Sequence, residues 1–270
     1  MLTIIVNLFL AAFLSSLMVG MTSPVITFSK SLMAGFSFIH GVLAGGLIAT
    51  YLIYAVGVTI PPEMITLLYV LIMAFLVGEL IERGYSTDAA SAISTSMSAM
   101  FSVLFAYLSG PYASRAWAII IGTSLIVTPS EIVLLAVFLV LLSIIVVLFR
   151  KEILYTSFDP EGAYTLGYAV RFYRYVIYAS IALVVVALTY TLGIIIAHIL
   201  IATPGAVALS ISKKKYLRVS ILIALIIGLL GYFLAYIMST PPSVGVGVVS
   251  SMILIFGEVY KIRGFHSRSD

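Results

Sequence analysis

Residues 132–149 read IVLLAVFLVLLSIIVVLF, an unbroken apolar run between Glu131 and the pair Arg150-Lys151. Apolar and polar residues do not alternate in it, so it predicts a membrane-spanning helix and not a strand of a closed barrel. Its side chains are almost all Val, Leu and Ile, which indicates a helix that faces lipid.

The composition of the whole chain agrees with this run. The chain has 270 residues, of which 63% are hydrophobic and 9% are charged, with a mean hydropathy of +1.24. Soluble domains carry about 25% charged residues. Because lipid cannot hydrogen-bond the backbone, an all-α polytopic membrane protein in the cell membrane is expected. The absence of cysteine excludes disulfides and thiolate metal sites.

Outward from this run, the other apolar stretches predict a bundle of nine membrane-spanning helices in a single transmembrane domain, 1–270. The count is eight if the first stretch does not cross. The fourth stretch is rich in Ala and Ser, so we expect it inside the bundle. A shorter piece, 116–127, predicts an interfacial or re-entrant segment. The nine stretches are 2–21, 33–58, 64–81, 89–108, 132–149, 173–190, 193–211, 216–238 and a last one that ends near Tyr260.

The distribution of basic residues supports this count. With nine crossings and an outer N-terminus, all 14 Lys and Arg residues except Arg115 lie on the inner side. Merging the stretches between Tyr173 and Ile211 would place Lys213-Lys214-Lys215 outside. The net charge of +4 therefore reflects membrane topology and gives no reason to expect nucleic acid as a partner.

A polar island, SFDPEGAYTLG at residues 157–167, follows the opening run. Asp159 can cap a helix, Pro160 suits its first position, and Glu161 favours the positive end of the helix dipole. Gly167 suits its end. Such a short surface helix is either a simple connection between two spans or a docking element for a cytosolic partner.

Few polar side chains fall inside the expected spans. His40 and His198 do, and each is either a hydrogen-bonded packing residue or part of a metal path. Pro204 and the pair Pro241-Pro242 predict broken helices of the kind that line transporter cavities, or else an ordinary kink and a loop end. Glu79, Glu131 and Glu258 are expected at solvated or interfacial positions. No P-loop, HExxH or GxSxG motif is present, so no enzyme activity is expected.

Several patches of the sequence carry a resemblance to a known family. Residues 158–167 are similar to its pattern F-D-P-E-x-A-x-x-L-G, and the weaker patches are His40–Gly45 with Gly35, Ser86–Ala90, Gly122–Glu131, Gly193 with Pro204–Ala206, and Pro241-Pro242. Taken together, these patches resemble the membrane-spanning permease of ABC importers of the vitamin B12/metal type, the class that takes up zinc, manganese or iron.

The resemblance implies that 159–167 is the coupling helix, which rests in a cleft of a cytosolic ATP-binding subunit. Its candidate contacts are Asp159, Pro160, Glu161, Tyr164, Leu166 and Gly167. It also implies a homodimeric pore in the membrane lipid, an extracytoplasmic metal-binding protein, and no cofactor besides ATP on the partner. Four residues before the histidine the family has Asp, where this chain has Phe36. Our hypothesis is that His198 is the mate of His40, in a nitrogen-rich site for a divalent metal, zinc or manganese first. The alternatives are that metal is not the substrate, or that the channel holds no site at all.

The mechanism so implied is alternating access driven by the separate ATPase, with an outer gate near Pro129 and Pro241-Pro242. The alternatives are an ATP-independent secondary transporter or channel for a cation or small solute, and a purely structural membrane scaffold. A secondary transporter or channel needs intramembrane carboxylates or a selectivity ring. The sequence shows neither convincingly.

Overall fold

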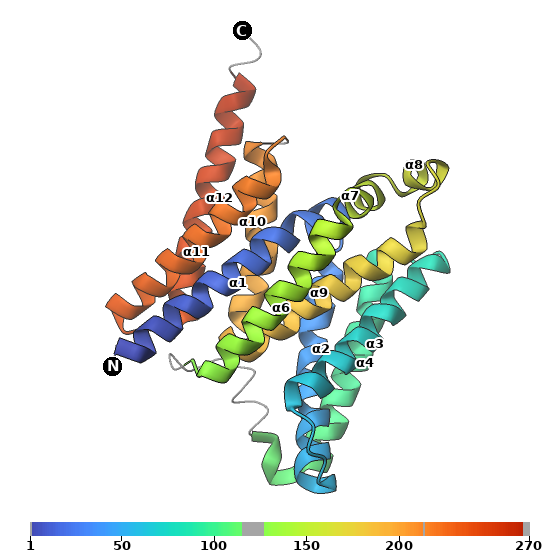
Figure 1. Cartoon of the computed structure of the whole chain (residues 1–270), viewed down its shortest axis with the longest axis vertical. Coiled ribbons are helices and arrows are strands. Elements are labelled where there is room, and N and C mark those ends of the chain that lie inside the picture. The colour runs from blue at the N-terminus through green and yellow to red at the C-terminus, as the bar shows by residue number, and fades with distance from the viewer. Residues whose placement is uncertain (1, 115–126, 213, 267–270) are drawn as a thin grey trace.

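The structure of the chain is a computed structural model that describes residues 2–114, 127–212 and 214–266. All regular elements in these ranges are helical, as the apolar runs predicted (Figure 1). The elements are α1 (Leu2–Phe28), α2 (Leu32–Tyr51), η1 (Leu52–Val56), α3 (Pro62–Glu82), α4 (Thr87–Ser109), η2 (Gly110–Tyr112), α6 (Pro129–Leu148), α7 (Arg150–Phe158), α8 (Pro160–Thr165), α9 (Val170–Leu192), α10 (Ile194–Ile211), α11 (Tyr216–Met238) and α12 (Pro242–His266).

Within the described ranges, 8 helices are long and apolar enough to cross a membrane, and α1 is one of them. The ninth expected helix is α12, whose apolar part, Pro242–Gly257, is shorter. The whole of α12 has 25 residues, but the part beyond Gly257 contains Glu258, Lys261 and Arg263 and is not apolar. The crossing of the membrane by α12 therefore stays a prediction. The short apolar piece expected at 116–127 lies, except for Val127, outside the described residues.

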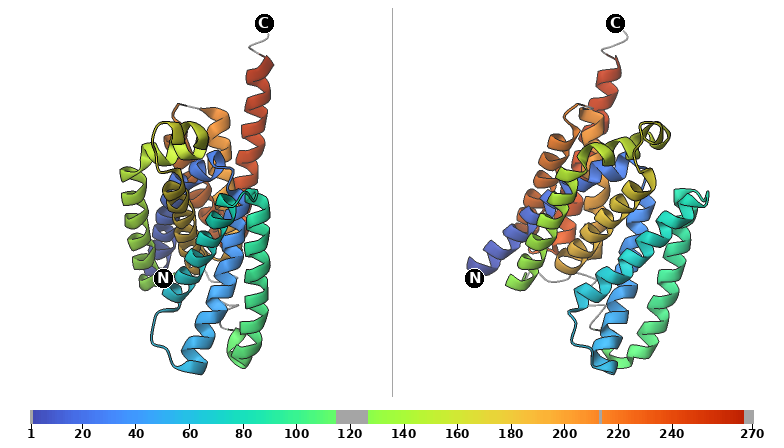
Figure 2. Two further views of the ribbon diagram at one scale, coloured as in Figure 1. Left: turned by 90° about the vertical axis from the view of Figure 1, so that its right-hand side faces the viewer. Right: turned by 45° about the vertical axis from the view of Figure 1, so that its right-hand side comes forward.

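Successive spans alternate in direction, so their connections gather at two ends of the bundle (Figures 1 and 2). One end, which we call the foot end, carries α7, α8, the α1–α2, α3–α4 and α10–α11 connections, and the end of α12. The opposite end carries the N-terminus, the α2–α3 loop, the turn at Gly193 and the α11–α12 turn. The basic residues of the described ranges lie toward the foot end, as the charge pattern requires, whereas Arg115, Lys213 and Arg268 fall outside those ranges.

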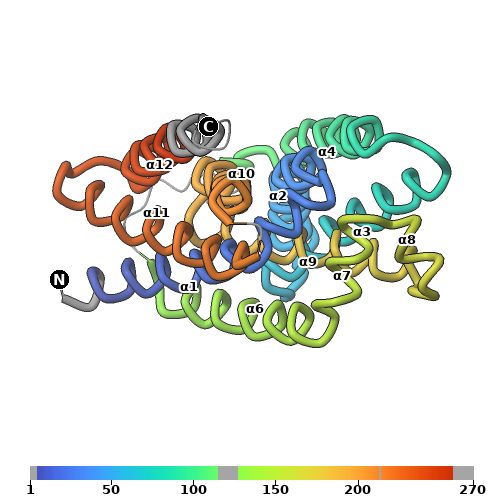
Figure 3. The backbone as a smooth tube through the Cα atoms, turned by 90° about the horizontal axis from the view of Figure 1, so that it is seen from above, coloured from blue at the N-terminus to red at the C-terminus, as the bar shows by residue number. Residues whose placement is uncertain are grey.

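Helix α9 is the central element. It contacts α1, α2, α3, α6 and α10, and most of its length is buried. Seen along the bundle in Figure 3, α2, α3 and α4 gather on one side of it, and α1, α10, α11 and α12 on the other. We call the first set the α2–α4 group. Helix α6 packs on the outside, and its apolar side chains are largely exposed, as expected of a helix that faces lipid.

The expected interior position of the fourth span is wrong for the single chain. Its small residues, such as Ser94 and Ser98, are buried against α2, as the close-packing argument predicts. The other face of α4 lies at the edge of the bundle, where Val103 is 73% and Tyr107 84% exposed. The prediction of one close-packed Ala and Ser face is thus confirmed, whereas the prediction of an interior helix is not.

The expected break at Pro204 is also wrong, because α10 runs through it without interruption. Proline lacks an N–H and crowds the preceding turn, which opens the hydrogen-bond ladder. The Ser23 hydroxyl of α1 enters this gap: it accepts a hydrogen bond from the Gly205 N–H at 2.8 Å and donates one to the Ile201 carbonyl at 2.9 Å. The ladder is completed by a side chain from another helix.

The other prolines expected at a break or at the outer gate, Pro129, Pro241 and Pro242, occupy ordinary helix boundaries. Pro129 is the first residue of α6, whose start is closed by a capping box between Thr128 and Glu131. Pro241 lies in the turn after α11, and Pro242 opens α12. At Pro241-Pro242 the sequence pattern therefore marks a connection between two helices and not a break within one.

Candidate functional site

The polar island folds as the short helix that its sequence predicts. Only Asp159 separates α7 from α8, and its carboxylate accepts a hydrogen bond from the Gly162 N–H at 2.9 Å. A Cβ at position 162 would lie 2.2 Å from that carboxylate, so a larger residue there would displace the capping side chain. At the other end, Gly167 has φ +82°, and the N–H groups of Gly167 and Tyr168 bond back to Tyr164 and Ala163. This is a Schellman motif.

The outward face of this helix is apolar, although it lies beyond the spans. Phe158 is 76%, Tyr164 75% and Leu166 67% exposed. We call residues 158–167 the foot; Figure 1 shows α8 projecting from the foot end of the bundle. Of the predicted contact residues, Pro160, Glu161, Tyr164 and Leu166 are exposed on the foot. Asp159 and Gly167 are exposed too, but their visible function is to begin and end the helix.

The two intramembrane histidines lie close together, as expected of a pair. The ring centroids of His40 on α2 and His198 on α10 are 6.2 Å apart, and the rings are perpendicular. The Nδ1 atom of His40 is 2.9 Å from the Phe36 carbonyl, and that of His198 is 2.9 Å from the Ile194 carbonyl. Such bonds place the proton on Nδ1 and leave both Nε2 lone pairs free for a metal.

A cavity of about 340 Å³ adjoins His40 between α2 and α4. It is lined by His40, Leu43, Ala99, Ser102, Val103 and Ala106. Phe36 occupies the place where the family pattern has Asp, and its ring lies 5.2 Å from that of His198. In the part of the chain that the structure describes, no group of three or more His, Asp or Glu residues could enclose a metal ion. One copy therefore offers two nitrogen ligands at this point.

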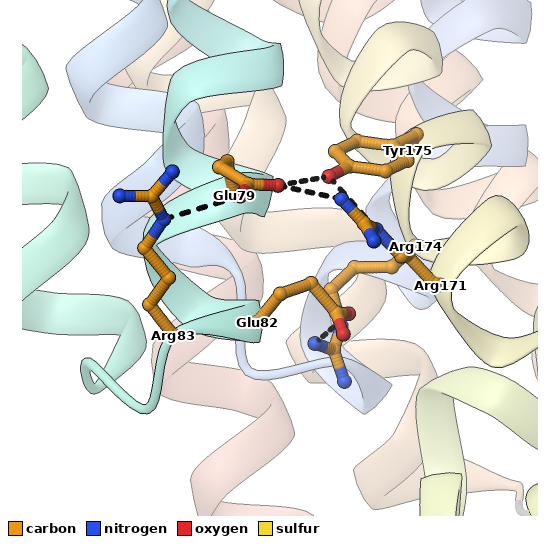
Figure 4. Close-up of polar contacts among 6 residues, drawn as sticks. All are labelled: Glu79, Glu82, Arg83, Arg171, Arg174 and Tyr175. Atoms are coloured by element: carbon orange, nitrogen blue, oxygen red, sulfur yellow. Dashed lines mark hydrogen bonds and ion pairs between the residues drawn. The ribbon is translucent and has the colours of Figure 1, made fainter.

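The sequence reasoning missed an ionic cluster between α3 and α9 (Figure 4). Arg171 donates to Glu79 at 2.8 Å, and Arg174 pairs with Glu82. Glu79 also accepts hydrogen bonds from Tyr175 at 2.9 Å and from Arg83 of its own helix at 3.1 Å. The signal was the equal spacing of the two acids and of the two arginines, three residues apart on each helix.

Comparisons with known proteins agree with this architecture. Over 236 residues, 87% of this chain and 82% of the relative, the chain is 27% identical to a protein named as a probable metal transport system membrane protein from Thermotoga maritima. It is 27% identical over 144 residues, 53% of this chain and 51% of the relative, to the manganese transport system membrane protein MntC of Listeria innocua.

Among solved structures, PsaBC from Streptococcus pneumoniae in complex with Fab matches with a TM-score of 0.79. The match covers 94% of this chain and 90% of that chain at 21% sequence identity, so it concerns the fold. The profile of the ABC 3 transport family matches residues 1–261. The match spans nearly the whole chain, and this multi-pass membrane protein therefore belongs to the ABC 3 transport family.

Proposed function

We propose that this chain is the permease subunit of an ABC importer of a divalent metal ion, driven by a separate cytosolic ATP-binding subunit. The single observation that carries the proposal is the foot, a capped helix that presents Phe158, Tyr164 and Leu166 to the space beyond the membrane. Water does not favour such exposed apolar side chains, and a partner's cleft would cover them. Relatives named for manganese and iron transport support the choice of metal.

The rest of the assembly follows from this proposal. The basic residues at the foot end support a cytosolic position for the foot. The whole chain, 1–270, acts as one domain, and the exposed face of α4 and the adjoining cavity would meet a second copy. An extracytoplasmic metal-binding protein would deliver the ion at the opposite end, near the outer gate that we assign to Pro129, Pro241 and Pro242. The chain itself performs no bond chemistry.

The proposed path for the ion passes His40 and His198, because their ring centroids lie 6.2 Å apart at membrane depth and each Nδ1 contacts a backbone carbonyl, which leaves each Nε2 for a ligand. Two imidazoles without a carboxylate favour zinc over manganese on ligand softness, whereas manganese prefers oxygen ligands. Binding must also be weak enough for release into the cytosol. We therefore propose that the histidine pair binds the substrate ion only transiently.

The foot is tested by replacing exposed side chains that do not cap the helix. Tyr164→Ala and Leu166→Ala, combined, should abolish copurification of the ATPase and ATP-dependent metal uptake while the isolated permease keeps its melting temperature. Val133→Ala, equally exposed on lipid-facing α6 at 62%, is the matched control. Asp159 is a poor choice, since its loss also removes the cap. Uptake that survives ATP depletion and foot mutation would favour the secondary transporter or channel.

The histidine pair is tested by titrating zinc and manganese into the purified complex. His198→Ala should weaken zinc binding, because one of two nitrogen ligands is lost. His266→Ala, at the end of α12, removes the only other histidine besides His40 and serves as the control. Equal zinc affinities in wild type and His198→Ala would remove His198 from the path and leave the foot proposal unaffected.

A further inference from the structure

Helices α3 and α9 present matching faces to each other at the foot end. On each helix the side chains involved follow the spacing i, i+3, i+4 and i+7, which gathers them on one stripe. The stripes are Phe75, Gly78, Glu79 and Glu82 on α3, and Arg171, Arg174, Tyr175 and Tyr178 on α9.

Tyr175 is seated on α3 by contacts that leave its ring little freedom. Its ring stacks on that of Phe75, with centroids 5.1 Å apart and planes 17° from parallel. A Cβ at position 78 would lie 2.6 Å from the ring, so Gly78 is what lets the ring lie across α3. The hydroxyl then reaches Glu79 at 2.9 Å. The two helices are therefore held by shape as well as by charge.

The two ion pairs differ in exposure. In the Glu82–Arg174 pair the side chains are 27% and 22% exposed, whereas Arg171, the partner of Glu79, is 62% exposed. Partly shielded charges interact more strongly than fully solvated ones. The Glu82–Arg174 pair is thus the stronger of the two cross-links. Arg83, 69% exposed, pairs with Glu79 within α3 and joins no second helix.

These cross-links lie at the point where the foot passes into the bundle. Residues 166–169 alone connect α8 to α9, and Tyr168 within them bonds back to α8 and stacks on Tyr155 of α7. Arg171 and Arg174 lie in the first turns of α9. Their partners end α3, which packs on α2 and α4, the two helices that line the cavity beside His40.

We infer that Glu79–Arg171 and Glu82–Arg174 are positioning residues of the transport cycle: they pass a displacement of the foot from α9 to α3, and so to the α2–α4 group. This inference rests on the proposed function. Without the cross-links, α9 can shift against α3. The ATPase then hydrolyses ATP, but the helices around the ion path do not follow the movement of the foot. The expected failure is therefore loss of coupling between hydrolysis and transport, with the fold and the assembly intact.

The test uses the permease–ATPase complex with its binding protein in proteoliposomes, and Mn²⁺ as the transported probe. The readout is Mn²⁺ taken up per ATP hydrolysed. Arg174→Gln and Glu82→Gln should each lower this ratio about 5-fold or more, within the usual range of coupling between sites, with ATPase activity little changed. The charge swap Glu82→Arg with Arg174→Glu should restore most of it. Arg83→Gln, which breaks an ion pair within α3 alone, should leave the ratio unchanged.

Gly78→Ala is a second, charge-neutral perturbation: it displaces the Tyr175 ring and should also lower the ratio. An unchanged ratio in Arg174→Gln, Glu82→Gln and Gly78→Ala overturns the inference. So does a loss that tracks a lower melting temperature and that the charge swap fails to rescue, because the pairs would then be structural only. If wild type itself shows no ATP-driven Mn²⁺ or Zn²⁺ uptake, the proposed function fails, independently of the cross-links.

Discussion

Replacing Ser23 with alanine tests how α10 crosses the membrane with Pro204 inside it. The Ser23 side chain is fully buried, and its hydroxyl satisfies both the Gly205 N–H and the Ile201 carbonyl. Ser23→Ala removes a single oxygen atom. Both backbone groups then lose their partner at a depth where no water replaces it.

The magnitude follows from these two bonds. A buried donor or acceptor left without a partner costs about 1–3 kcal/mol. Interhelical hydrogen bonds in membranes are worth less on average, about 0.6 kcal/mol with a maximum near 1.7, because the unfolded helices find other partners. Pro204 prevents α10 from closing its own ladder without strain. We therefore expect Ser23→Ala to lower the free energy of unfolding by about 1–3 kcal/mol.

Unfolding in mixed micelles with increasing sodium dodecyl sulfate measures this change. Ser15→Ala is the matched control, because the Ser15 hydroxyl, equally buried in α1, bonds only to the Ala12 carbonyl of its own helix. Its loss should cost no more than about 0.5 kcal/mol. In a Pro204→Ala background the ladder can close, so Ser23→Ala should cost less there. Equal costs for the two serines, or no coupling with position 204, would refute the reasoning.

Three further changes give defined outcomes. Gly205→Ala would place a Cβ 2.4 Å from the Ser23 carbonyl oxygen and should destabilise the protein by about 2–3 kcal/mol in the same assay. An unchanged free energy of unfolding would show that α1 and α10 can move apart without cost, contrary to this prediction. Ser239→Gly relieves a non-glycine residue at φ 52° and should raise stability by about 0.5–1 kcal/mol; a lower melting temperature would contradict this. Phe36→Asp adds an oxygen ligand beside His40 and should strengthen Mn²⁺ binding in calorimetric titration more than Zn²⁺ binding; an unchanged preference would argue against a metal site there.

Local sequence was enough for the spans and the foot. Long apolar runs can only be helices in lipid, and Asp159 with Pro160 fixes the start of α8 within a few residues. The predicted break of α10 at Pro204 was wrong for a reason that lies outside the local sequence. The hydroxyl of Ser23 accepts the hydrogen bond of the Gly205 N–H from 182 residues away in the chain, and no local pattern reveals such a partner.

The same limit explains the ionic cluster and α4. Glu79 and Arg171, 92 residues apart, each resemble an ordinary charged residue at a span end, and only the packing of α3 on α9 joins them. The Ala and Ser pattern of α4 correctly predicted one close-packed face. The opposite face, with Val103 and Tyr107, has no neighbour in the described chain, and sequence periodicity cannot tell a neighbour in the same chain from one in another copy.

Gly193 is the only residue between α9 and α10, with φ 90° and ψ 165°, a conformation that is essentially confined to glycine. A hairpin this short has no slack, so whatever shifts the end of α9 also shifts α10, and His198 lies only one turn further on. Epitope tags and reporter cysteines for topology mapping therefore belong in the α2–α3 loop, which has room for them. An insertion at Gly193 would lengthen the one-residue connection and so loosen the link between α9 and α10.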